Sequence, residues 1–198
     1  ERIQEGLYQK FAQQLIKNKQ AYYCFCTEED LQKEREEAQQ KGIPYVYSRK
    51  ALELSEEDIK EKLTANDPYT IRFKMPDEKK LIFNDLLRGE IEFDLSLISD
   101  FVILKSDGSP SYNFAAVIDD MQMQISHVIR GEDHISNTPR QMVVYMALEK
   151  ELPNFAHMPM ILGPDKSKLS KRHGATNVTD YRDQGYLAEA MFNYLSLL

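Results

Sequence analysis

Basic side chains and a hydroxyl gather in residues 163–175, a stretch near the end of the sequence. Its basic members lie within eight positions: Lys166, Lys168, Lys171, Arg172 and His173. Glycines near both ends predict a loop rather than a helix, and Ser170 stands among the cations. Mobile cations and a hydroxyl on such a loop suit a polyphosphate whose charge must be held while a bond breaks. Charge alone also allows a solvated basic loop or a nucleic-acid contact.

A second candidate site centres on Arg130, which follows a run of apolar residues and precedes a glycine. A planar guanidinium at the end of a strand suits bidentate capture of a carboxylate. The alternative is a structural arginine paired with Glu132 or Asp133, which could instead accept hydrogen bonds from ribose hydroxyls. Tyr112 follows a turn, so its phenol either hydrogen-bonds a small polar substrate or joins the core.

The other chemically versatile residues form no recognised constellation. The four histidines are scattered, and no metal cluster or nucleophile triad stands out. Cys24 and Cys26 supply only part of the ligand set that structural zinc takes, so no zinc is expected. Asp119 and Asp120 are adjacent, so on a helix they would not face each other. They are predicted to be a solvated helix end rather than an acid–base pair.

Composition limits the class of protein. A chain of 198 residues with 42% hydrophobic content can bury a real core in one large or two small domains. A net charge of −7 excludes a bulk polycation, so any nucleic-acid contact needs a local basic surface. Two closely spaced cysteines indicate a reducing, cytoplasmic setting. No apolar run approaches the roughly 20 residues of a membrane span, and no signal peptide opens the chain. The sequence lacks an initial methionine and stops inside an apolar helical pattern, which predicts a fragment.

The first half of the chain predicts helices followed by antiparallel strands. An apolar residue every fourth position predicts a helix over 2–18, and residues 21–26 are predicted to be extended. Capping patterns at Thr27 and Ser55 predict helices over 28–41 and 56–65. Alternating apolar residues over 69–75, with shorter apolar runs at 81–83 and 91–93, predict strands. Residues 20–98 are therefore expected to form an α+β unit.

From residue 101 the pattern changes to alternating strands and helices. Strands are predicted over 101–104, 125–129 and 157–162, and helices over 112–121 and from Thr138 onward. This order predicts an α/β fold with the C-terminal half of a Rossmann-like, doubly wound parallel sheet. Ligands of such sheets bind beyond the carboxyl ends of the strands, where Arg130 and the lysine-rich loop are expected. Two further helices are predicted after that loop.

Several segments together resemble one enzyme family. Residues 168–172, Lys-Leu-Ser-Lys-Arg, resemble the second signature loop of class I aminoacyl-tRNA synthetases. The following His-Gly-Ala at 173–175 is similar to the glutamyl-tRNA synthetase form of that loop. Residues 109–115 and 128–141 look like catalytic-domain segments of bacterial-type glutamyl-tRNA synthetase, in the order and spacing of that family.

The resemblance also implies a domain organisation. Residues 21–26 and 86–91 resemble the acceptor-stem-binding insertion of these enzymes. The expected divisions are a catalytic-domain helix at 1–19, the α+β insertion at 20–98, the second half of the Rossmann-like catalytic domain at 99–162, and the signature loop with the start of a helical stem-contact domain at 163–198.

The resemblance assigns roles to individual residues. The glutamate side chain would meet Arg130 and Tyr112, with Ala116 nearby. The catalytic loop residues would be Lys168, Ser170, Lys171 and Arg172; the three cations would bind the ATP phosphates. The nucleotide would lie near Glu132, Asp133, His134 and Ile161. Arg88 would contact tRNA; the alternative is a solvated turn residue. Magnesium would accompany ATP.

The sequence departs from the family pattern in specific places. The first signature, a His-x-Gly-His element, does not occur in the chain, and no anticodon-binding domain is present. Some relatives have an asparagine where Ala116 stands. The cysteine pair lacks the second Cys or His pair that zinc-containing relatives have, since Tyr45, Tyr47 and Lys50 occupy that region.

The resemblance implies a monomeric, cytoplasmic glutamate–tRNA ligase as the parent protein, with ATP, L-glutamate and the tRNA acceptor stem as partners and no membrane. The chain alone is expected to be inactive, because half of the ATP and glutamate site would lie upstream. The alternatives are a paralogue that glutamylates a modified base in tRNA and a non-catalytic RNA-binding fragment. Whether the parent charges only the glutamate tRNA or also the glutamine tRNA stays open.

Overall fold

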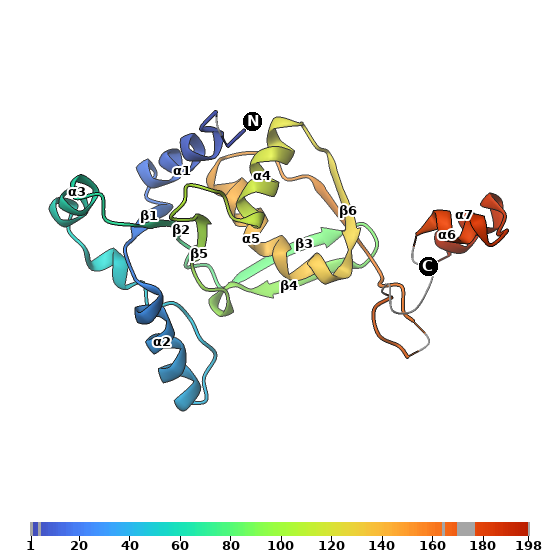
Figure 1. Ribbon diagram of the computed structural model, residues 1–198, viewed down its shortest axis with the longest axis horizontal. Helices are drawn as coiled ribbons and strands as arrows, with labels where there is room; N and C mark the ends of the chain where they lie inside the picture. The colour runs from blue at the N-terminus through green and yellow to red at the C-terminus, as the bar shows by residue number, and fades with distance from the viewer. Residues whose placement is uncertain (1, 4, 164, 170–176, 198) are drawn as a thin grey trace.

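A computed structural model describes residues 2–3, 5–163, 165–169 and 177–197. Within them, small β-sheets lie at the centre and helices surround them (Figure 1). The protein is therefore a mixed α/β fold, as the sequence predicts. In these described residues no helix has the length and apolar character that crossing a membrane requires.

The elements agree in kind with those expected from the sequence. The helices are α1 (Leu7–Lys17), α2 (Glu28–Gln40), α3 (Glu56–Thr64), α4 (Tyr112–Gln122), α5 (Thr138–Ala147), α6 (Val178–Asp183) and α7 (Ala188–Ser196). The strands are β1 (Ala21–Cys24), β2 (Thr70–Phe73), β3 (Lys80–Asp85), β4 (Gly89–Asp94), β5 (Phe101–Leu104), β6 (His127–Gly131) and β7 (Asn154–Met158). The 3₁₀ helices are η1 (Lys50–Glu53), η2 (Leu95–Leu97) and η3 (Glu132–Asn137).

Local capping signals position two of the helices. At α2 the Thr27 hydroxyl accepts a hydrogen bond from the backbone N–H of Asp30 at 3.2 Å, and the Asp30 carboxylate accepts from the backbone N–H of Thr27 at 3.0 Å. Ser55 and Asp58 form the same reciprocal pair at α3. These contacts satisfy N–H groups that have no partner inside the helix, so both helices begin where the sequence predicts.

The predicted parallel sheet is confirmed for β6 and β7, which pair in parallel from His127 with Asn154 to Gly131 with Met158. Strand β5 was expected in the same sheet, and that expectation is wrong. It pairs antiparallel with β2, which in turn pairs with β1. A continuous apolar run predicts a strand buried on both faces but says nothing about its partner.

Proline accounts for a second difference from the sequence prediction. The third strand was expected over 157–162 but spans Asn154–Met158. Pro159 has no N–H to donate to a neighbouring strand, so the pairing stops before it. Strand β6 likewise begins two residues later than predicted and ends at Gly131, which puts Arg130 inside the strand, next to its end.

The hairpin of β3 and β4 packs against the parallel pair. The Phe83 ring meets Phe155 of β7 edge-on, with centroids 5.9 Å apart, and stacks on Phe93 at 6.0 Å. The backbone N–H of Leu86 donates to the Phe155 carbonyl at 2.9 Å. One core cluster thus contains residues from both sides of the boundary expected near residue 98. The division into domains stays a prediction.

Candidate functional site

Arg130 is held on the parallel strand pair by side chains that the sequence reading did not associate with it. Its Nε–H donates to Nε2 of His157 at 3.1 Å, and its Nη2 donates to Oγ1 of Thr138 at 2.9 Å. The guanidinium carbon lies 5.7 Å from the centre of the Phe155 ring. The alternative in which Arg130 pairs with Glu132 or Asp133 is wrong, because both carboxylates bind other cations.

These contacts leave part of the guanidinium for a ligand. Nε–H and the adjacent Nη2 hydrogen form one edge of the planar group, and both are engaged. The remaining edge, made of Nη1 and Nη2, has the geometry that binds a carboxylate through two parallel hydrogen bonds. Burial lowers the pKa of Arg130, with Tyr112 and Asp120 opposing that shift, yet an arginine stays charged in proteins.

The support behind Arg130 is a buried pair formed by His157 and Asp85. His157 Nδ1 lies 2.7 Å from Asp85 Oδ2, and both side chains are shielded from solvent. Asp85 also accepts from the backbone N–H groups of Leu87 at 3.0 Å and Arg88 at 3.1 Å. Burial acts to raise the pKa of Asp85, but the hydrogen bonds from His157 and these amides outweigh it and hold that pKa below its usual range.

Tyr112 lies beside Arg130 at the start of α4. Its side chain is 57% exposed, so the core position considered from the sequence is wrong. The phenol lies close enough to the Arg130 guanidinium to raise its pKa, and the Tyr112 ring centre lies 6.0 Å from that of His134. Ala116 follows one helical turn later and is half-buried. The residues expected around a glutamate side chain therefore belong to one region.

The 3₁₀ helix η3 carries the acidic residues expected near a nucleotide. Asp133 forms an ion pair with Lys168, and that hydrogen bond lowers the pKa of the Asp133 carboxyl. Glu132 accepts from the backbone N–H of Met160 at 3.0 Å and pairs with the guanidinium of Arg88. The structure thus brings the lysine-rich loop and η3 together, as the role assignments require.

The described part of the lysine-rich loop folds back on itself. Gly163 N–H donates to the Ser167 carbonyl at 2.8 Å, and Leu169 N–H donates to the Ile161 carbonyl at 2.8 Å. Lys166 has a positive φ of 60°, which suits the tight turn. Ile161 is thereby tied to the loop by a backbone contact. The predicted catalytic residues Ser170, Lys171 and Arg172 lie outside the described residues.

Arg88 was predicted either to contact tRNA or to be a solvated turn residue. Its Nε–H donates to the His157 carbonyl at 3.1 Å, and Nη2 bonds Glu132. The interpretation as a solvated turn residue is wrong, because the side chain joins the β3–β4 turn to β7 and η3. About a third of the side chain (35%) is exposed, so a tRNA contact stays a prediction.

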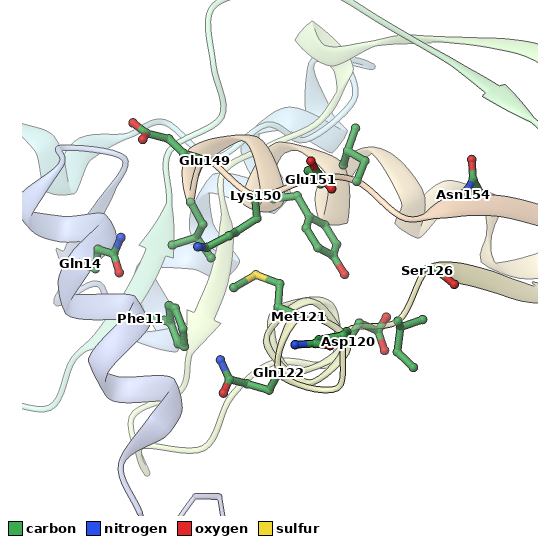
Figure 2. A pocket seen from close by; sticks show the side chains of 15 residues that line it. Phe11, Gln14, Asp120, Met121, Gln122, Ser126, Glu149, Lys150, Glu151 and Asn154 are labelled. Carbon is green, nitrogen blue, oxygen red and sulfur yellow. The ribbon is translucent and has the colours of Figure 1, made fainter.

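The adjacent carboxylates of α4 are not a solvated helix end. Asp119 accepts from Arg2 Nη1 at 2.6 Å and from the Tyr8 hydroxyl at 2.8 Å. Asp120 is half-buried in a cavity of about 840 Å³ between α1, α4 and the chain that follows α5 (Figure 2). Burial, then the charge of Asp119, raises the pKa of Asp120, while Arg130 lowers it. The sequence could not predict that the neighbouring Asp119 and Asp120 have such different surroundings.

The two cysteines contact a tyrosine hydroxyl, and one of them also contacts an arginine. Cys24 Sγ and Cys26 Sγ each lie 3.3 Å from the Tyr47 hydroxyl, and Arg72 Nε donates to Cys24 Sγ at 3.3 Å. Burial acts to raise the pKa of Cys24, but Tyr47, the Cys26 amide and Arg72 lower it overall. Across the part of the chain that the structure describes, no group of three or more His, Cys, Asp or Glu side chains could hold a metal ion.

Comparison with known proteins, by family model and by sequence, finds the same family of enzymes. The family model described as tRNA synthetases class I (E and Q), catalytic domain, matches residues 3–198. Glutamate--tRNA ligase 1 of Caldanaerobacter subterraneus subsp. tengcongensis is 52% identical over 191 residues, which cover 96% of this chain and 40% of that protein. Glutamate--tRNA ligase of Aquifex aeolicus is 53% identical over 192 residues, 97% of this chain and 41% of that protein.

A solved structure gives the same result for the fold. The crystal structure of a glutamate tRNA ligase from Elizabethkingia meningosepticum CCUG26117 in complex with its amino acid superposes with a TM-score of 0.85 at 35% identity. The match covers 100% of this chain and 44% of that one. The chain therefore spans about two fifths of the length of the curated relatives it matches.

Proposed function

This chain belongs to the class I tRNA synthetases of the glutamate and glutamine type, and on that basis we propose that the full-length protein containing it is a glutamate–tRNA ligase. The enzyme first joins glutamate to ATP, forming glutamyl-adenylate and releasing pyrophosphate. It then transfers the glutamyl group to the 3′-terminal ribose of tRNA. We assign residues 20–98 to acceptor-stem binding, residues 99–162 to the second half of the catalytic domain, and residues 163–198 to the signature loop and the start of a stem-contact domain. The enzyme is proposed to be monomeric and cytoplasmic.

The observation that carries this proposal is the placement of two kinds of cation around η3. Arg130 stands just before this short helix and keeps one guanidinium edge for a carboxylate. Lys168 reaches Asp133 within the helix from the lysine-rich loop. A carboxylate and a polyphosphate bound at these positions would lie close together, which is the arrangement that adenylate formation needs.

The proposed chemistry needs no side-chain nucleophile. The α-carboxylate of glutamate attacks the α-phosphorus of ATP in line, and pyrophosphate leaves. Arg130 and Tyr112 orient the amino acid through its side-chain carboxylate. The loop cations Lys168, Lys171 and Arg172 stabilise charge on the phosphates, and Ser170 shapes the loop. Magnesium arrives with ATP as part of the substrate. Catalysis then consists of positioning and charge stabilisation.

Glutamate-dependent ATP–pyrophosphate exchange by the full-length protein tests the proposed function. We expect Lys171→Ala to slow adenylate formation by roughly 100- to 1,000-fold, by analogy with loss of one donor at a developing charge. The KM for glutamate should change little. Lys166→Ala is the matched control, because Lys166 is an exposed lysine of the same loop with no assigned role. Unchanged single-turnover activation in Lys171→Ala would remove the loop from the catalytic site.

Binding of tRNA at different salt concentrations tests the role of Arg88. We expect Arg88→Ala to weaken binding and to lower the slope of log K against log salt by about one, the loss of one phosphate contact. Glu132→Gln is the control for loss of the internal ion pair. It weakens the pair between Arg88 and Glu132 but keeps the Arg88 guanidinium available to tRNA. A slope that is the same in Arg88→Ala and wild type would exclude the phosphate contact.

A further inference from the structure

His157 is a buried side chain that no step of the proposed reaction uses. It is inaccessible to solvent, and its imidazole stacks on Phe155 with centroids 6.2 Å apart. Its backbone N–H also donates to Asp85, at 3.2 and 3.1 Å to the two carboxylate oxygens. A histidine fixed at its backbone, its ring face and one ring nitrogen has little freedom to rotate.

The surrounding donors and acceptors define which ring nitrogen carries the hydrogen. Nδ1 lies 2.7 Å from a carboxylate oxygen of Asp85, so Nδ1–H donates to it. Nε2 faces the Nε–H of Arg130 at 3.1 Å and the Thr138 hydroxyl at 3.2 Å. Because the arginine Nε can only donate, Nε2 must be the acceptor. Asp85 therefore selects the ring form that can hold Arg130.

Thr138 completes the support behind the arginine. Its Oγ1 accepts from Arg130 Nη2 at 2.9 Å and lies 3.2 Å from His157 Nε2 and 3.5 Å from the His134 carbonyl, to which it can donate. His157 and Thr138 thus engage neighbouring donors on the same edge of the guanidinium. A flexible arginine chain is thereby fixed before substrate arrives, which lowers the ordering cost of binding.

We propose that His157 is a positioning residue for glutamate recognition: supported by Asp85, it turns the Nη1–Nη2 edge of Arg130 toward the side-chain carboxylate of the substrate. This inference rests on the proposed function, because it concerns the same amino-acid site. It adds an element outside the residues that touch substrate, on a strand that follows Arg130 by 27 positions.

Two substitutions at His157 separate its two bonds. In His157→Asn the amide nitrogen takes the place of Nδ1 and keeps the bond to Asp85, but no acceptor reaches Arg130. In His157→Gln the longer side chain puts its amide oxygen near the place of Nε2, so an acceptor for Arg130 remains. Both variants lose the ring and its packing. His157→Gln also removes the Nδ1–H donor to the buried Asp85 carboxylate, so it is expected to lose more thermal stability than His157→Asn.

Steady-state exchange by the full-length variants gives the functional result. We expect His157→Asn to raise the KM for glutamate about tenfold or more, since a misplacement of about 1 Å can cost up to roughly 100-fold. His157→Gln should recover most of that loss, and the KM for ATP should stay within about twofold in both. A glutamate KM that rises at least as much in His157→Gln as in His157→Asn, in step with the losses of thermal stability, would refute the positioning role.

A measurement made without substrates distinguishes failure of the His157 positioning role from failure of the proposed ligase function. In selectively ¹⁵N-arginine-labelled full-length protein, the Arg130 Nε–H should exchange slowly with solvent in wild type and His157→Gln and quickly in His157→Asn. Fast exchange in wild type would overturn the positioning role whatever the activity. Slow exchange without any glutamate-dependent pyrophosphate exchange would instead refute the proposed function, and the positioning of glutamate with it.

Discussion

Arg130→Gln in the full-length protein is expected to lower kcat/KM for glutamate by roughly 100-fold or more and to narrow the gap between glutamate and glutamine. A guanidinium donates to both oxygens of a carboxylate, and charge-assisted hydrogen bonds contribute about 1.5–3 kcal/mol each. Glutamine presents N–H groups to the same donors, which leaves buried donors facing donors. Without Arg130, this basis for choosing between two substrates of nearly equal size disappears.

The comparison needs both amino acids, the melting temperature and a control arginine. Arg35→Gln makes the same chemical change on the exposed face of α2, where Arg35 pairs with Glu28 at 2.8 Å, and should leave both rates near wild type. Because Arg130 also contacts His157 and Thr138, some loss of stability is expected. A destabilised Arg130→Gln that still prefers glutamate as strongly as wild type would remove Arg130 from amino-acid recognition.

Asp85→Ala should produce the largest loss of stability, on the order of 3–5 kcal/mol, because several donors lose one charged acceptor at about 1–3 kcal/mol each. The substitution leaves the buried Nδ1–H of His157 and the amides of Leu87 and Arg88 without their acceptor. Thermal unfolding of the full-length protein, with hydrogen exchange at these amides, measures the effect. Asp107→Ala is the matched control, because the exposed Asp107 accepts from Ser109 at a surface turn, and its loss should be much smaller. Equal losses of stability in Asp85→Ala and Asp107→Ala would show that the buried Asp85 contacts stabilise the fold no more than a surface turn does.

The Asp85 contribution also has a defined pH dependence. The folded-state pKa of Asp85 lies below its usual value, so the charged form is stabilised by folding. That stability is fully present above the unfolded pKa of about 3.9 and is lost as the pH falls through the lower folded value. The stability difference between wild type and Asp85→Asn should therefore shrink in acid. A difference that grows on acidification would contradict an ionised Asp85 in the folded protein.

Local signals explain why much of the fold could be predicted. The capping boxes at Thr27 and Ser55 act within three residues of chain, and both helices end within one residue of their predicted limits. The alternation of strands and helices from residue 101 onward follows from periodicity alone. The partner of β5 could not be predicted in this way, because an apolar run fits any strand whose two faces are covered.

The residues of the candidate site also differ in whether a local sequence signal could predict them. Arg130 and Tyr112 could be recognised from their types, turns and family resemblance, and the structure brings them together. Asp85 could not, because it contacts His157 across 72 positions and neither residue carries a local signal. The ion pair of Lys168 with Asp133 is intermediate, since the resemblance put both near the nucleotide but did not predict their contact.

The packing of the β3–β4 hairpin against β7 limits how this protein can be recombined with its relatives. A chimera that exchanges residues 20–98 as a tRNA-binding module would also exchange Asp85 and Phe83, which support the strand that holds Arg130. A donor sequence without an acidic residue at position 85 would then impair amino-acid selection although every residue touching glutamate is retained. In a successful chimera, β3 and β7 should therefore come from the same parent protein. The junctions between the two parents should lie outside both strands.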